Sequence, residues 1–139
     1  MPSRDIVLAA HQQITREWWQ RRERFDLFVS QAVLREAGRG NAEAAARRLA
    51  ALQGIPVLTV GAEVSDLAER FLKTGVMPAK AAIDAIHIAV AVVHGMDYLL
   101  TWNCTHIANA AIRAKIEQTC REAGLQPPMI CTPEELIEE

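Results

Sequence analysis

The stretch that decides the fold is AAIDAIHIAVAVVHGMDYLLTWN, which runs from Ala81 to Asn103. Its first half is almost entirely apolar and predicts a buried helix over 80–94, with one carboxylate, Asp84, inside the run. Its second half predicts a short buried strand over 97–102. An apolar helix that leads directly into an apolar strand is typical of a parallel sheet with helices on its faces.

The same alternation of helices and short apolar runs extends along the chain. We predict strands at 25–30, 55–60, 97–102 and 127–132. We predict helices from Ser3 to about Arg22, from 31 to Gly38 or Gly40, and at 41–54, 62–75, 80–94 and 104–124, with a last one beginning at Thr132. This order predicts an α/β fold, and ligands in such sheets bind beyond the carboxyl ends of the strands. Ser30, Thr59 and the 101–103 segment are therefore the places to search for a site.

The length, charge and cysteine content of the chain limit the kinds of protein that it can be. A chain of 139 residues, half of them hydrophobic, predicts one packed domain over 1–139. A net charge of −2 gives no general attraction for nucleic acid. The three cysteines are widely spaced and odd in number, which favours reduced thiols. The apolar stretch 79–93 is too short for a membrane span and no signal peptide is visible, so we expect a soluble cytoplasmic protein.

Asp84 has two interpretations. An aspartate in the first turn of a helix is stabilised by the helix dipole, which requires no site. Alternatively, a carboxylate in so apolar a helix is retained because it pairs with another group or binds a metal. His87 shares the helical face of Asp84, and it either supports that carboxylate or is an ordinary core histidine.

Thr101 and Asn103 end the predicted strand, where turn chemistry alone explains both residues. His106 follows Asn103 by three positions and can face the same cleft. A zinc site at Cys104 and His106 is disfavoured, because the spacing is wrong and no second pair of ligands accompanies them. Glu36, on the helix after the first predicted strand, is either a solvated glutamate or part of a site.

Three stretches together resemble the PIN domains, specifically the VapC-type toxin nucleases of bacterial toxin–antitoxin pairs. They are SQAVLREAGRGN (30–41), the stretch AAIDAIHIAVAVVHGMDYLLTWNCTHIANA (81–110) and PPMICTPEEL (127–136). The central stretch is the most specific of the three. The resemblance implies a parallel sheet whose carboxyl edge gathers acidic residues around Mg²⁺ or Mn²⁺, which such oxygen ligands suit.

Carried onto this sequence, the resemblance implies Glu36 and Asp84 as metal ligands, with Asn103 in place of a further acid. Thr101 matches the hydroxyl at the strand end, and His87 and His106 are supporting residues. The implied activity is that of an endoribonuclease toxin, in which the metal activates water against an RNA phosphodiester. The implied partners are the RNA substrate, a cognate antitoxin protein and a second copy of the chain in a homodimer.

The start of the chain departs from the family pattern. The family begins with a central strand that ends on an acid, and SRDIVLAA reads instead as the start of a helix. We therefore expect the central strand and the first acid to be missing, with Asp5 as the one early surrogate for that acid. A start further upstream, a decayed toxin, or a strand supplied by another chain would each account for the gap. The alternative function is a catalytically inactive PIN-like module that binds protein or RNA.

Overall fold

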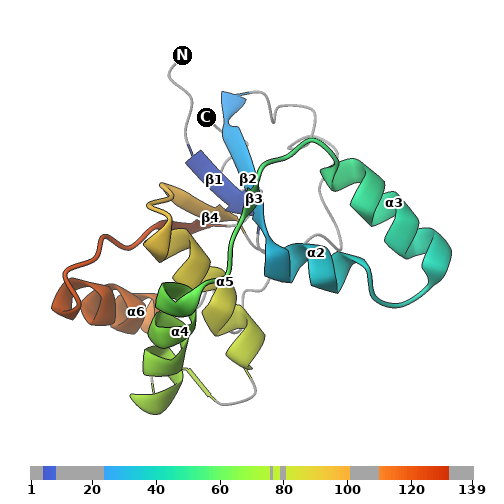
Figure 1. Ribbon diagram of the computed structural model, residues 1–139. Coiled ribbons are helices and arrows are strands. Elements are labelled where there is room, and N and C mark those ends of the chain that lie inside the picture. The colour runs from blue at the N-terminus through green and yellow to red at the C-terminus, as the bar shows by residue number, and fades with distance from the viewer. Residues whose placement is uncertain (1–4, 9–23, 76, 79–80, 101–109, 132–139) are drawn as a thin grey trace.

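A single parallel sheet of five strands forms the centre of the protein (Figure 1). The computed structural model describes residues 5–8, 24–75, 77–78, 81–100 and 110–131. The strand order is β3-β2-β1-β4-β5, and all four pairings are parallel. The strands are β1 (Asp5–Leu8), β2 (Asp26–Ser30), β3 (Val57–Leu58), β4 (Tyr98–Leu100) and β5 (Met129–Cys131). The predicted α/β fold with a parallel sheet is confirmed.

The central strand is β1, so the prediction that this strand is missing is wrong. β1 pairs with β2 on one side and with β4 on the other. Ile6, Val7 and Leu8 are each at most 2% exposed, because helices cover both faces of the sheet. A strand buried on both faces is apolar throughout and lacks the alternation that marks a half-exposed strand. The predicted helix from Ser3 is therefore wrong over Asp5–Leu8, and residues 9–23 lie outside the described part.

Five helices lie at or close to their predicted positions. They are α2 (Gln31–Ala37), α3 (Ala42–Leu52), α4 (Ala62–Lys73), α5 (Ala82–Val93) and α6 (Ala110–Glu122). Asn41 begins α3 as predicted, since its side-chain oxygen accepts the backbone N–H groups of Glu43 and Ala44. Gly75 follows α4 with a φ of +75°, a left-handed conformation that favours glycine. The predicted helix from Thr132 lies outside the described residues.

The sheet separates two hydrophobic layers. Val7, Leu99 and Ile130 pack on one face against α4, α5 and α6, which lie together on one side in Figure 1. Ile6, Leu8 and their neighbours pack on the other face against α2 and the end of α3. Alternate residues of β1 thus serve different layers, which makes β1 part of both cores.

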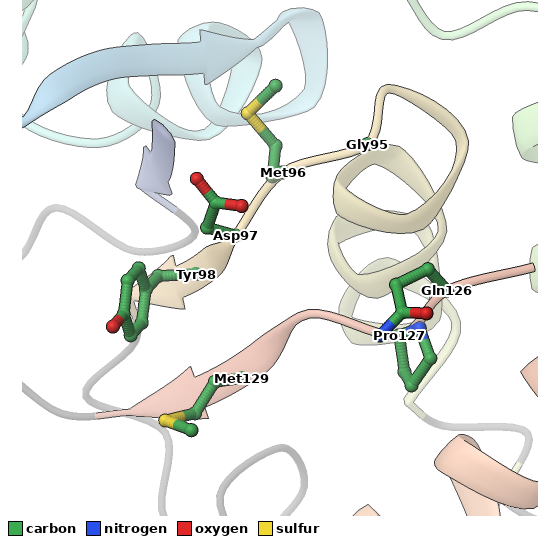
Figure 2. A pocket seen from close by; sticks show the side chains of 7 residues that line it. All are labelled: Gly95, Met96, Asp97, Tyr98, Gln126, Pro127 and Met129. Atoms are coloured by element: carbon green, nitrogen blue, oxygen red, sulfur yellow. The ribbon is translucent and has the colours of Figure 1, made fainter. Parts of the chain in front are cut away.

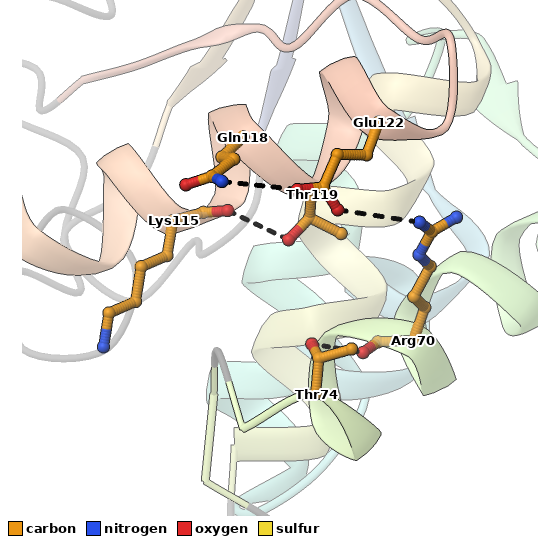
Figure 3. A network of polar contacts seen from close by, with 6 residues as sticks. All are labelled: Arg70, Thr74, Lys115, Gln118, Thr119 and Glu122. Atoms are coloured by element: carbon orange, nitrogen blue, oxygen red, sulfur yellow. Dashed lines mark hydrogen bonds and ion pairs between the residues drawn. The ribbon is translucent and has the colours of Figure 1, made fainter.

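The contact between α4 and α6 carries an exposed polar network (Figure 3). Arg70 Nη2 lies 4.0 Å from Glu122 Oε2, and Gln118 Nε2 donates to Glu122 Oε1 at 3.3 Å. Exposed ion pairs of this kind contribute little, typically about 0–1 kcal/mol. The apolar layer beneath, including Phe71 and Ile116, therefore holds the helices together. Among the described helices, none is long and apolar enough to cross a membrane.

Candidate functional site

The carboxyl end of β2 leads into α2 without an intervening loop. Ser30 is the last residue of the strand and the N-cap of the helix, and its buried Oγ accepts the backbone N–H of Val33 at 3.1 Å. Because the cap fixes the first turn, α2 leaves the sheet in one direction from its carboxyl edge. Glu36, near the end of this short helix, has a side chain that is 42% exposed. Ser30 was predicted as a strand end, whereas its capping role was not predicted.

Asp84 lies in the first turn of α5 and is partly buried. The helix returns the chain toward the amino end of β4, so its beginning lies on the side of the carboxyl edge. No side chain caps the α5 N-terminus at Ala81. A carboxylate in this first turn therefore benefits from the positive end of the helix dipole. Both interpretations of Asp84, the helix-start residue and the ligand, agree with this position.

His87 joins the two helices that carry the acids. Its Nε2 lies 2.5 Å from Oε1 of Glu36, a residue 51 positions away in the sequence. The His87 side chain is only 3% exposed. From the sequence, His87 was either a support for Asp84 or an ordinary core histidine, and its contact with Glu36 was not predicted. No feature of the local sequence indicates this pair, because α2 and α5 are far apart in the sequence and come into contact only in the folded chain.

This contact joins Glu36 to α5, the helix that carries Asp84 in its first turn. His87 follows Asp84 by three residues, which is a rise of about 4.5 Å along α5. Carboxylates such as those of Glu36 and Asp84 suit a hard divalent cation, which takes oxygen ligands. Within the described ranges, however, no group of three acidic, histidine or cysteine side chains forms a complete set. Thr101, Asn103 and His106 lie outside those ranges, so the described donors fit a divalent cation as part of a ligand set.

Two further side chains hold the segment after β3. Gln31 Oε1 accepts the backbone N–H of Val60 at 2.9 Å, and His94 Nε2 lies 2.9 Å from the carbonyl oxygen of Thr59. Neither Gln31 nor His94 was predicted from the sequence to have such a role. Thr59 is thus held by its backbone between α2 and the end of α5. This arrangement gives no chemical role to its side chain.

The pocket in Figure 2 lies at the opposite edge of the sheet. It has a volume of about 390 Å³ and is lined at the amino ends of β4 and β5 by Gly95, Met96, Asp97, Tyr98, Gln126, Pro127 and Met129. None of the candidate site residues lines it. The pocket is therefore separate from the carboxyl edge where Glu36 and His87 meet.

Asp5 also lies at the amino edge, beside Asp97 and level with Asp26 in the strand register. Burial raises the pKa of its carboxyl group, and the Asp97 and Asp26 carboxylates raise it further. Asp5 begins β1, and the family acid ends that strand. The proposal of Asp5 as a surrogate ligand is therefore wrong. Ala9 and Ala10 follow β1 in the sequence, so no acid occurs at that point.

The comparisons with known proteins agree with this architecture. The PIN domain family model matches residues 8–103, and the chain belongs to this family. The crystal structure of VapC20 from Mycobacterium tuberculosis, described as a sarcin-ricin loop cleaving toxin, has a similar fold. The TM-score is 0.55 at 18% sequence identity, over 80% of this chain and 94% of the toxin chain. No curated protein sequence matches this chain.

Proposed function

We propose that this protein is a metal-dependent endoribonuclease that hydrolyses RNA phosphodiesters. The observation that supports the proposal is the contact between His87 and Glu36, which joins α2 to α5, the helix that carries Asp84 in its first turn. Membership of the PIN domain family supports the same activity. The similarity to VapC20 supports the fold in which the acids are arranged.

Glu36 and Asp84 would hold Mg²⁺ or Mn²⁺, with Asn103 completing the ligand set and Thr101 beside it. When bound, the ion lowers the pKa of a water and neutralises charge on the phosphate. Glu36 and Asp84 also keep anionic phosphate at a distance until a cation is present. Ser30 fixes the first turn of α2 and so helps to orient the helix that carries Glu36. His106 would have a supporting role.

A second candidate function is that of an inactive PIN-like module that binds protein or RNA. It is favoured by Ala9 and Ala10, which follow β1 where the family pattern places an acid. Asn103 adds to this argument, because a neutral amide attracts a cation less strongly than a carboxylate. The two functions predict the same fold and differ in whether RNA is cut.

The proposed setting follows from the VapC-type resemblance. We propose a cytoplasmic protein that acts as a homodimer and is inhibited by a cognate antitoxin. RNA is its proposed substrate, and the structural neighbour VapC20 is a toxin that cleaves the sarcin-ricin loop. The exposed segment of α2 that carries Glu36 leaves the candidate site open to a partner or a nucleic acid.

The test is cleavage of a mixed RNA substrate with Mn²⁺ by the wild type and by Asp84→Asn and Glu36→Gln. Asp66→Asn is the matched control, since Asp66 is an exposed aspartate on α4. We expect a loss of cleavage of at least about 10–100-fold in the two site variants, since this is the usual cost of removing even an outer partner of a metal ligand. The control should retain full activity.

If the wild type does not cut RNA, the next measurement is its binding to RNA in the presence of EDTA, which tests the inactive PIN-like module. Binding without cleavage would support the inactive module. Cleavage that is equal in all four proteins would show that the activity does not arise at Glu36 and Asp84.

A further inference from the structure

We infer that His87 is a positioning residue that fixes the Glu36 carboxylate for a divalent cation. The inference rests on the proposed function, since it assigns a role within the same site. It depends on three observations, which are the contact between the side chains, their unequal burial, and an unpaired nitrogen on the imidazole.

The side chains of His87 and Glu36 differ in their conformational freedom. His87 lies in the middle of α5, and its neighbours Ala85, Ile88 and Ala91 are fully buried. Its imidazole is therefore fixed by packing. Glu36 lies on the surface of α2 with a flexible side chain, so fixing it costs conformational entropy. The hydrogen bond therefore lets the fixed imidazole of His87 set the orientation of the flexible Glu36 side chain.

The geometry leaves half of the carboxylate free for another ligand. Nε2 contacts Oε1 of Glu36, and an ionised carboxylate can only accept, so Nε2 carries the donated hydrogen. Because the Glu36 side chain is partly exposed, Oε2 is left to accept a further ligand. A carboxylate bonded to a fixed donor through one oxygen presents the other to a cation in one orientation.

The other imidazole nitrogen indicates that this histidine is not there for stability. Nδ1 of His87 is buried and has no hydrogen-bond partner within the described structure. A buried polar atom without a partner costs about 1–3 kcal/mol. An apolar residue of similar size would avoid this cost in so apolar a helix. The hydrogen bond to Glu36 is therefore the reason that the position holds a histidine.

The experiment is titration of the wild type, His87→Leu, His87→Gln and Asp84→Asn with Mn²⁺ by calorimetry without RNA, beside thermal unfolding without metal. His87→Leu removes the donor and fills the space, whereas His87→Gln keeps an N–H that reaches toward Glu36. We expect the Leu variant to bind Mn²⁺ about 10–100-fold more weakly, the usual effect of losing such a partner. Its melting temperature should equal or exceed that of the wild type. The Gln variant should bind within about threefold of the wild type, since the donor is kept.

Each other outcome overturns the inference in a different way. If Asp84→Asn loses Mn²⁺ binding and His87→Leu does not, the proposed site stands and the positioning role fails. If both His87 variants lose melting temperature and affinity together, His87 is a structural residue. If the wild type itself does not bind Mn²⁺, the metal site of the proposed function fails as well.

Discussion

Asp5 and Asp97 hold each other by two reciprocal hydrogen bonds at the amino edge of the sheet. The backbone N–H of Asp5 donates to Oδ2 of Asp97 at 3.0 Å, and the backbone N–H of Asp97 donates to the carbonyl oxygen of Asp5 at 3.1 Å. The pair begins the parallel register of β1 and β4. The side chain of one aspartate thus fixes where the central strand begins.

The first prediction concerns this side chain. Asp97→Ala removes the acceptor of the Asp5 N–H and should lower the free energy of unfolding by about 1 kcal/mol, a typical value for one hydrogen bond. Asp97→Asn keeps an acceptor oxygen and removes a charge near Asp5, so it should be at least as stable as the wild type. Urea unfolding of the three proteins measures both effects. Equal stability of the alanine and asparagine variants would show that the bond does not contribute.

The second prediction concerns pH. The pKa of Asp5 is raised above its ordinary value of 3.8, by burial first and then by Asp97 and Asp26. The folded protein therefore binds this proton more tightly than the unfolded chain does, and the ionised group destabilises the fold at neutral pH. Asp5→Asn should raise the free energy of unfolding at pH 7 by on the order of 0.5 kcal/mol.

This gain should decline as the pH falls through the raised pKa and vanish below 3.8, where Asp5 is protonated in both states. Thermal unfolding across that pH range measures it. Asp66→Asn on α4 makes the same change of charge away from the sheet edge and is the control. A gain that is the same at every pH would contradict the assignment.

The third prediction separates two helix caps. Ser30 caps α2, which carries Glu36, and Asn41 caps α3, which carries none of the candidate site residues. Ser30→Ala and Asn41→Ala should each cost about 1 kcal/mol of stability. Only Ser30→Ala should also weaken Mn²⁺ binding, because α2 orients Glu36. Chemical unfolding and calorimetry of both variants test this, and equal effects on binding would contradict it.

The fourth prediction concerns the thiol of Cys120. Burial raises its pKa to about 11, against a smaller opposing effect of Arg70. A buried thiol that stays protonated reacts slowly, because the thiolate is the nucleophile. Iodoacetamide at pH 8 should therefore leave Cys120 unmodified in the folded protein and modify it in urea, as peptide mass spectrometry would show. Rapid modification in the folded state would indicate that α6 opens locally.

The fold was largely predictable because most of its elements carry local signals. Asn41, Gly54 and Gly75 mark helix ends by their own side chains or backbone conformations. β1 carried no such signal. Its residues Ile6, Val7 and Leu8 are all apolar, so the strand shows no alternation, and Ser3 before it resembles a helix cap. Only its pairing with β2 and β4 identifies it as a strand.

The candidate site was predictable in its residue types and not in its contacts. The resemblance selected Glu36, Asp84 and His87 from motifs, and the structure brings Glu36 and His87 together. The contact between His87 and Glu36 was not predicted, because helical spacing relates a residue to its own helix and carries no information about a neighbouring helix. Thr101, Asn103 and His106 stay predictions.

The sequence by itself determined the alternation of strands and helices, the apolar character of α5 and the acids that a PIN domain can use, because these depend on residue type and short spacing. The tertiary structure decided that Asp5–Leu8 is the central strand, that Asp5 lies at the amino edge, and that His87 contacts Glu36. The His87–Glu36 pair joins residues 51 positions apart, and the Asp5–Asp97 pair joins residues 92 positions apart. Packing against the sheet, rather than any local preference, creates them.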